Sequence, residues 1–479
     1  MKLWITTLFA VLFFLGLSFS PEITRGQDQD SNANPKPAAK ALPPIGGTDE
    51  QDTDQTPDAL QPDDRPLTGL QQLTTGAPPE LHSYWIPGVT YTNFIQSNAL
   101  GQGGGNGWNS TSYFVGSLSL LQNWSNSQLS LNYSGGGEIS SDSMVGSGQY
   151  QQLGAVQTFH WRRWQLTLLD QFAYLPESEF GFGAGSGIQI PGVGGGLAPG
   201  LPGLQNGFTP SQSIFTAAGP RYTNSFGTQV SYTLSRRSSV TFGGVYGILR
   251  FTQPGNIESN NAIMNAGYNY QVSKTDTLGL SYDFIAYHYL DFPQAMGVHA
   301  IQGVYGKRIT GHLALQISGG PEIINFRESS GTGTQTRYIA GTGLAGLTYA
   351  LAGGSLGANY SHGVTSGSGV FQGATTDQVT GGATRRLSRV WSGNLNLGYA
   401  HNKSVLGGAA TQSQEYNSVY IGAGLERPLS RTLDFRLSYT ANIETSSNTT
   451  CVGPNCGTSF TTHTISVGMS WRARPFVLH

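Results

Sequence analysis

Histidine side chains are the residues in this chain best suited to acid–base or metal chemistry, and there are nine of them. They are scattered, with no HExxH pair or other tight metal-ligand spacing, so we predict no metal site. His288 and Asp291 could act as a base with a supporting carboxylate, but closeness along the chain is a weak signal of catalysis. The glycines at 103–105 fall in a predicted loop without a following helix, which does not favour phosphate binding. We therefore predict neither an enzyme nor a bound cofactor.

Cys451 and Cys456 are the only cysteines, in the segment CVGPNC. Gly453, Pro454 and Asn455 between them can turn the chain back on itself, so a disulfide is predicted if the compartment is oxidising. The closed loop is short, and its entropic stabilisation amounts to about 2 kcal/mol. No histidine or further cysteine accompanies the pair, which argues against metal binding.

The composition limits where such a protein can reside. Only 11% of the 479 residues are Asp, Glu, Lys or Arg, and 67 are glycine. An ordinary soluble protein has about 25% charged residues and about half this share of glycine. With 38% hydrophobic residues, part of the surface must face something other than water. The formal net charge of −2 gives no polyanion-binding signature, so nucleic acid is not an expected partner.

The N-terminus has the layout of a secretory signal peptide. Lys2 precedes an apolar run from Leu8 to Leu17, followed by small and polar residues. This run is too short to span a bilayer as a helix, which needs about 20 residues. We predict cleavage after Gly26, which makes residues 1–26 a removed leader.

Residues 27–80 form a distinct acidic segment. They contain nine prolines, ten acidic residues and three basic residues, for a segment charge of −7. Such a segment cannot bury enough apolar surface to offset the entropy of ordering it. We predict a disordered periplasmic linker, with contact to the cell wall or a periplasmic partner as the alternative to a purely solvated spacer.

From about residue 88 onward, apolar and polar residues alternate. In 432–445 the odd positions from Leu433 to Ile443 are mostly apolar and the even positions are polar. The segments 276–287 and 459–471 repeat the pattern. Strands of this kind suit either a β-sandwich with one buried face or a barrel with lipid outside and water inside. No later apolar run reaches 18 residues, which excludes transmembrane helices.

Connection lengths favour the barrel. Short polar turns recur about every 36 to 42 residues, with one gap of about 74, and longer loops alternate with them. This spacing predicts 18 strands, the first at 88–97 and the last at 459–471; 16 is the alternative if 88–97 or 354–362 is not a full strand. An even number lets the first strand pair antiparallel with the last. Asp170 falls on an apolar face and 298–308 has no clean face, so we expect a bulge or a register error there.

In architecture, the chain resembles bacterial outer-membrane β-barrels of the porin-like type over about 390 residues. The resemblance implies an all-β fold with one antiparallel transmembrane barrel over 81–479, located in a Gram-negative-type outer membrane. It also implies contact with outer-membrane lipids, insertion by the outer-membrane assembly machinery and a homotrimer as one arrangement. The segment ending at Trp471 resembles the closing strand of such barrels, although eight residues follow it, from Arg472 to His479.

Tryptophans and charges are sorted along the predicted hairpins. Five of the eight tryptophans lie at or beside short turns, which predicts a periplasmic girdle at the lipid headgroup level. They are Trp124, Trp161, Trp164, Trp391 and Trp471. Most basic residues after position 80 also fall near short turns, while most acidic ones fall near the loops. This basic rim either pairs with anionic headgroups or contributes to an axial field; we favour the first interpretation.

A few charged residues are candidates for the lumen, namely Asp283, Asp434, Arg436 and Glu426. The connection at 176–221 is the longest and follows the fifth strand, as does the loop that narrows the pore in porins. Glu177 and Glu179 near its start are therefore constriction candidates, and an external flap is the equally weighted alternative.

The resulting functional hypothesis is a passive outer-membrane channel for small hydrophilic solutes. The alternative is a non-conducting surface or export-accessory barrel, suggested by the acidic linker and the long third loop. An outer-membrane hydrolase, with its catalytic groups at the barrel wall or outer rim, is the least favoured hypothesis.

Overall fold

A computed structural model describes most of the chain after residue 82. The described residues are 83–97, 107–141, 147–175, 221–252, 256–290, 292, 294–328, 335–367, 371–405, 415–446 and 459–478. The predicted leader 1–26, the linker 27–80, the Cys451–Cys456 pair and residues 176–220 with Glu177 and Glu179 lie outside this set.

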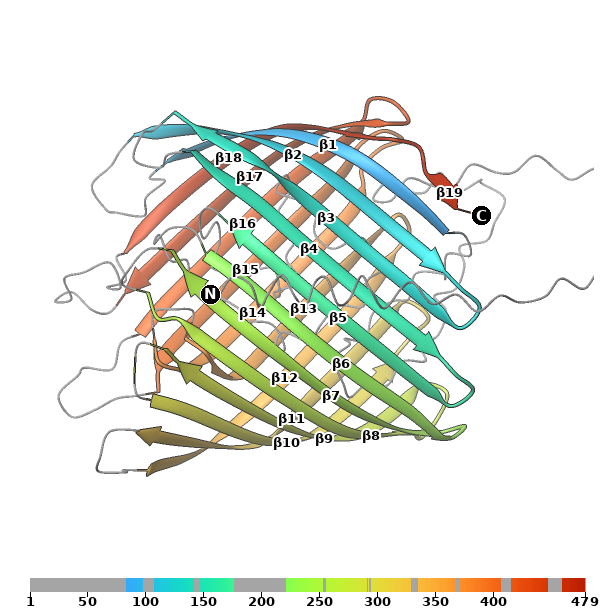
Figure 1. Cartoon of the computed structure of the whole chain (residues 1–479), viewed down its shortest axis with the longest axis vertical. Helices are drawn as coiled ribbons and strands as arrows, with labels where there is room; N and C mark the ends of the chain where they lie inside the picture. The colour runs from blue at the N-terminus through green and yellow to red at the C-terminus, as the bar shows by residue number, and fades with distance from the viewer. Residues whose placement is uncertain are drawn as a thin grey trace, which may run out of the picture. The chain divides into compact units, whose positions relative to one another are not determined.

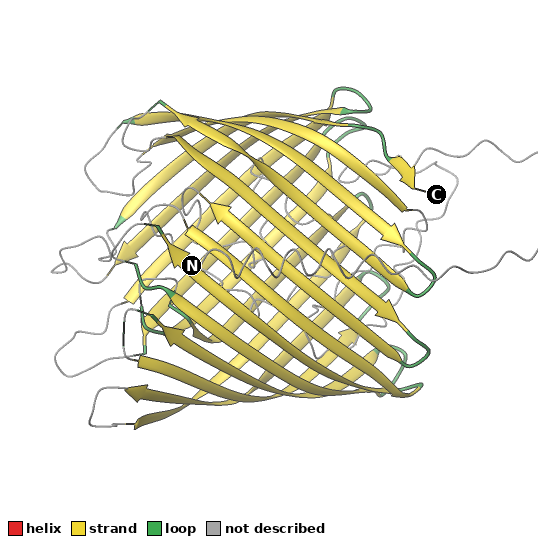
Figure 2. Ribbon diagram, viewed as in Figure 1, coloured by secondary structure: helices red, strands yellow, loops and turns green. Residues whose placement is uncertain are grey.

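Almost all of the described residues are in β-strands, as Figures 1 and 2 show. The strands are β1 (Ser83–Ser97), β2 (Trp108–Asn123), β3 (Ser127–Ser140), β4 (Ser147–His160), β5 (Trp164–Leu175), β6 (Arg221–Ser235), β7 (Ser238–Phe251), β8 (Ser259–Gln271), β9 (Asp276–Tyr289), β10 (Gln294–Arg308), β11 (Leu313–Glu328), β12 (Gln335–Leu351), β13 (Gly354–Thr365), β14 (Ala374–Arg386), β15 (Ser392–Ser404), β16 (Glu415–Pro428), β17 (Leu433–Ser446), β18 (Phe460–Arg472) and β19 (Phe476–Leu478). No membrane-spanning helix occurs in the part of the chain that the structure describes.

Strands β1 to β18 form one closed antiparallel barrel. Each strand pairs with its neighbour in sequence, and β1 pairs with β18 from Gly88↔Arg472 to Gln96↔Thr464. The prediction of an 18-stranded antiparallel barrel is confirmed, and the weak segment 354–362 is a full strand, β13. We call the side with the short turns, such as that between β2 and β3, the short-turn end and the opposite side the loop end; the short turns lie at the right in Figure 1.

The residues after β18 continue the wall. The Ala473 amide donates to the Pro87 carbonyl (2.9 Å), and β19 then pairs with the first residues of β1. The Trp85 and Phe476 rings stack with 4.6 Å between their centroids. The chain beyond Trp471 is therefore part of the barrel at its short-turn end.

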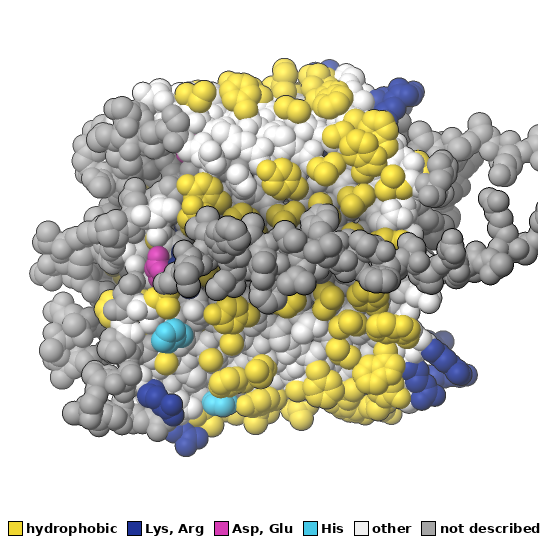
Figure 3. Space-filling view, viewed as in Figure 1, with side chains coloured by type: hydrophobic (Ala, Val, Ile, Leu, Met, Phe, Trp, Pro, Cys, Tyr) yellow, Lys and Arg dark blue, Asp and Glu magenta, His cyan; other side chains and the backbone are white. Residues whose placement is uncertain are grey.

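Alternation sets the two faces of the wall. On β9, Leu278, Leu280 and Tyr282 point outward and are exposed, whereas Ser281 and Asp283 point inward. Figure 3 shows apolar side chains spread over the outer face. The inward faces are less uniformly polar than predicted, because an apolar cluster lines them near the loop end. It consists of Ile257, Tyr287, Tyr289, Met296, Val298, Ile324, Phe326 and Val364.

The expected irregularity at Asp170 and in 298–308 is absent. The β4–β5 register runs unshifted from Gln151↔Tyr174 to His160↔Gln165, and β10 keeps one register with both neighbours. Asp170 faces outward because it alternates with the buried Leu169, and its carboxylate accepts a hydrogen bond from Asn224 Nδ2 (3.0 Å). A register shift occurs instead between Thr233 and Ser235.

Candidate functional site

A solute inside the barrel would contact the inner wall. Asp283 is an acidic residue near the middle of that wall. It lies near the middle of β9 and accepts hydrogen bonds from Asn265 Nδ2 on β8 and from the Ser281 hydroxyl (3.3 Å). Gln302 Nε2 on β10 donates at 3.5 Å, and Gln302 Oε1 accepts from the Ser318 hydroxyl (2.9 Å). The hydrogen-bond donors around this carboxylate are therefore neutral groups.

A second inward acid, Glu322, shares a row with Asp283. Ala300 on β10 is directly opposite Asp283 on one side and Glu322 of β11 on the other. Glu322 is buried, and its carboxylate accepts a hydrogen bond from the Val364 backbone amide. Its Oε1 has no hydrogen-bond partner. The sequence pattern puts Glu322 among the acidic residues near the loops, and the register across β9, β10 and β11 adds that it faces the lumen beside Asp283.

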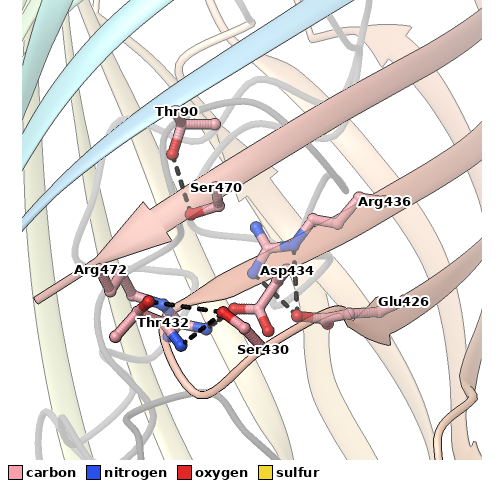
Figure 4. A network of polar contacts seen from close by, with 8 residues as sticks. All are labelled: Thr90, Glu426, Ser430, Thr432, Asp434, Arg436, Ser470 and Arg472. Carbon is pink, nitrogen blue, oxygen red and sulfur yellow. Dashed lines mark hydrogen bonds and ion pairs between the residues drawn. The ribbon is translucent and has the colours of Figure 1, made fainter. Parts of the chain in front are cut away.

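The other three lumen candidates come together near the short-turn end, on β16 and β17 (Figure 4). Arg436 donates to Glu426 Oε1 from Nη2 (3.1 Å) and from Nε (3.3 Å). Arg472 of β18 forms an ion pair with Asp434, and Thr90 bonds Ser470 (3.1 Å) just above it. In the sequence Arg472 is only the first residue after the closing strand, and the structure adds its inward pairing with Asp434. Each acid in this group is balanced by an arginine.

The connection between β13 and β14 turns into the loop-end mouth. The Tyr289 hydroxyl, at the end of β9, donates to the Ser366 carbonyl (3.4 Å), although three strands separate β9 from β13. The Phe371 ring packs against Tyr416 of β16 with centroids 5.1 Å apart. We call residues 366–373 the inward segment; residues 368–370 lie outside the described set.

Two glycines permit this path. Gly367 and Gly373 have φ angles of 85° and 94°, a region that glycine adopts without strain. A Cβ at Gly373 would lie 2.9 Å from Met296 Sδ, so only glycine fits against the wall there. The sequence offered a signal in the glycine- and serine-rich run 363–373, but the analysis favoured the longer connection at 176–221.

The wall opens where the inward segment leaves it. The β12–β13 pairing begins at Gly343↔His362, whereas β12 continues to Gln335 with β11 as its partner. The Thr342 hydroxyl donates to the His362 carbonyl (3.0 Å) at this point. Glu322 faces the departing strand, which explains why its carboxylate bonds the Val364 amide.

The five tryptophans proposed for a periplasmic girdle lie at or beside the short turns, and the girdle itself stays a prediction. Trp124, Trp161, Trp164 and Trp471 are exposed, and the partly buried Trp391 has the Arg427 guanidinium 5.5 Å from its ring centroid. The analysis missed Trp85, which joins them through Phe476. Figure 3 shows lysines and arginines at this end and others at the loop end.

Chemistry at the remaining candidates is limited. His288 faces outward on β9, and Asp291 lies outside the described residues. Among the described side chains, no group of three or more His, Cys, Asp or Glu residues could hold a metal ion.

The architecture itself identifies the class of protein. The strands of this barrel hydrogen-bond to one another around its whole circumference, and its exposed apolar outer face suits a bilayer. Exposed tryptophans border that face at the short-turn end, as aromatic residues do in outer-membrane barrels. The chain therefore folds as a porin-like closed antiparallel β-barrel whose outer face suits a lipid bilayer.

No protein-family model matches the chain, and no curated protein matches it in sequence. Similar solved structures include OpdK of Pseudomonas aeruginosa with vanillate, at 10% identity and a TM-score of 0.40, over 82% of this chain and 99% of that one. OccK2 (OpdF) of Pseudomonas aeruginosa in complex with glucuronate is 11% identical, with a TM-score of 0.41 over 81% of this chain and 98% of that one. OccAB4 of Acinetobacter baumannii is 11% identical, with a TM-score of 0.41 over 82% of this chain and 99% of that one.

Proposed function

We propose that this protein is a passive channel through which small hydrophilic solutes cross the outer membrane. The observation that carries the proposal is the opposite character of the two faces of one closed wall. On β17 and β18 the inward residues include Thr440, Asn442, Thr464 and Ser466, while outward positions carry large apolar side chains. Barrels of about 16–18 strands are wide enough to leave an aqueous passage.

The inward segment narrows the mouth of this passage. It reaches from β13 to Tyr289 and Met296 on the inner wall of β9 and β10. A solute entering from the loop end therefore passes beside this segment before it reaches the row that contains Asp283 and Glu322. We propose that residues 366–373 narrow the pore, which is the role that the sequence suggested for the 176–221 connection.

Tryptophans and basic residues at the short-turn end hold the barrel at its depth in the membrane. Indole rings favour the headgroup level, and each basic side chain near anionic headgroups contributes on the order of 1 kcal/mol. The strand β18, with its outward Val467, Met469 and Trp471, is the segment that we expect the assembly machinery to recognise.

Conductance across a planar lipid bilayer tests the channel. Folded barrel, verified by its resistance to dissociation in detergent without heating, should give discrete conductance steps. Absence of steps from protein that passes this folding control would remove the proposal.

A non-conducting surface or export-accessory barrel is the second candidate. The observation that favours it is the apolar cluster near the loop end, which together with the inward segment covers part of the mouth. A folded barrel without conductance that captures a periplasmic partner through residues 27–80 would support this candidate instead.

A further inference from the structure

We propose that the inward row Asn265–Asp283–Ala300–Glu322 binds the cationic group of a small organic solute, a guanidinium or a primary ammonium. The inference rests on the proposed channel function and names the class of solute that the channel favours. It follows from the register across β8 to β11, which places these four residues side by side on the inner wall.

The row presents hydrogen-bond acceptors on both sides of a methyl group. Asn265 is directly opposite Asp283, Asp283 is opposite Ala300, and Ala300 is opposite Glu322. Because the alanine side chain has no polar atom, it offers neither carboxylate a hydrogen bond. A planar cation with several N–H donors could bond acceptors of both acids.

Two acceptors in this row have no partner. Asn265 Oδ1 and Glu322 Oε1 form no hydrogen bond. Both residues are buried, with only 5% and 3% of their surface exposed. Unpaired acceptors at this degree of burial are costly, by about 1–3 kcal/mol each. A guanidinium group supplies five N–H donors and an ammonium group supplies three, which is the chemistry that this row lacks.

Among the described residues of β8 to β11, no arginine or lysine pairs with Asp283 or Glu322. The described basic residues of β8 to β11 are Lys307, Arg308 and Arg327. Lys307 and Arg327 face outward, and Lys307 pairs with Asp276 (3.6 Å). Arg308 ends β10 at the short-turn end, eight residues along the strand from Ala300.

His362 of β13 lies near Glu322 and interacts with it electrostatically. Its Nδ1 lies 2.7 Å from Asp377 Oδ1, so it already has a carboxylate partner. By contrast, Glu426 and Asp434 each have an arginine of their own. A divalent metal is less suited to the row, because no cluster of three ligating side chains occurs among the described residues.

The first experiment measures ion selectivity as the reversal potential in a potassium chloride gradient. Wild-type channels should favour potassium over chloride. Asp283→Asn and Glu322→Gln together should lower the permeability ratio by about threefold or more, because neutral amides replace both ionisable acids of the row. Glu415→Gln is the matched control, since it removes one acid from the outer wall, where it pairs with Lys403 (2.9 Å).

The second experiment titrates argininamide, and glutamate as the anionic comparison, against the folded barrel in detergent micelles by calorimetry. Argininamide should bind wild type and the control alike, and the double variant should lose at least about tenfold in affinity, equal to about 1.4 kcal/mol.

Anion selectivity in the wild type, equal selectivity in wild type and double variant, or unchanged argininamide affinity would each overturn the inference. A wild-type barrel that never conducts would defeat the channel proposal alone, because the titration tests the row independently of conductance.

Discussion

The pairing of Arg436 with Glu426 shows how the inner wall balances charge at the level of single residues. The two residues are directly opposite each other on β17 and β16, and the guanidinium donates twice to one carboxylate oxygen. Alternation along a strand shows on which face a residue lies. It does not show which residue of the next strand is opposite. The sequence therefore identified Arg436 and Glu426 as lumen candidates but did not show that they pair.

Replacing Arg436 with methionine should lower the free energy of unfolding by about 1–2 kcal/mol, because Glu426 is left as an unpaired, partly buried charge. Urea unfolding in micelles at neutral pH measures the loss. The double variant Arg436→Met with Glu426→Gln should recover most of it. Equal losses in the single and double variants would show that the arginine stabilises through packing instead.

Asp170 is the residue that departs most from the pattern of the outer wall. It lies between Leu168 and Phe172 on the outward face of β5, directly opposite the exposed Phe226 of β6. An ionisable side chain facing lipid is costly, and the one hydrogen bond from Asn224 offsets only part of that cost.

Asp170→Leu should therefore raise the free energy of unfolding of the barrel by about 1–2 kcal/mol. Unfolding in lipid vesicles is the measurement, with Asp170→Asn as the near-isosteric comparison, expected to have a smaller effect. A clear loss of stability in the leucine variant would contradict a lipid-facing position and indicate that another protein surface covers the pair.

At the scale of elements, the strands follow from local sequence and the inward segment does not. Strand β13 is rich in glycine and serine, yet it pairs with β12 and β14, because the backbone groups of both neighbours are available for hydrogen bonds. After His362 the chain no longer pairs with β12, and it turns toward Tyr289 and Met296. Contacts across several strands decide that path.

Gly373→Val should displace the inward segment and enlarge the single-channel conductance. A side chain at this position would collide with Met296 and would also have to adopt a positive φ. Gly311→Val is the matched control, because no atom lies within 4 Å of a Cβ built there. An unchanged conductance in folded Gly373→Val protein would show that the segment does not narrow the passage.

At the scale of the whole molecule, the two ends of the barrel differ. The short-turn end carries exposed tryptophans, basic side chains and the β19 pairing that extends β1 to Ser83. The loop end carries the apolar inner cluster and the inward segment. This asymmetry fits a barrel that is anchored at one rim and narrowed at the other.

The sequence by itself determined that the chain forms a barrel. The alternation of apolar and polar residues and the spacing of the turns are local properties, which can be read without the tertiary structure. The segment 376–387 is β14 at Ala374–Arg386, and 459–471 is β18 at Phe460–Arg472. β1 begins five residues before the predicted position 88, because β19 and β2 pair with its first residues.

Only the tertiary structure decided which residues meet on the inner wall. The row Asn265–Asp283–Ala300–Glu322 joins four strands, and its alignment depends on the register that closure of the whole sheet imposes. A shift of one residue between two strands would turn the side chains of one of them to the other face. The arrangement of the lumen is therefore a property of the closed barrel rather than of any one of its strands.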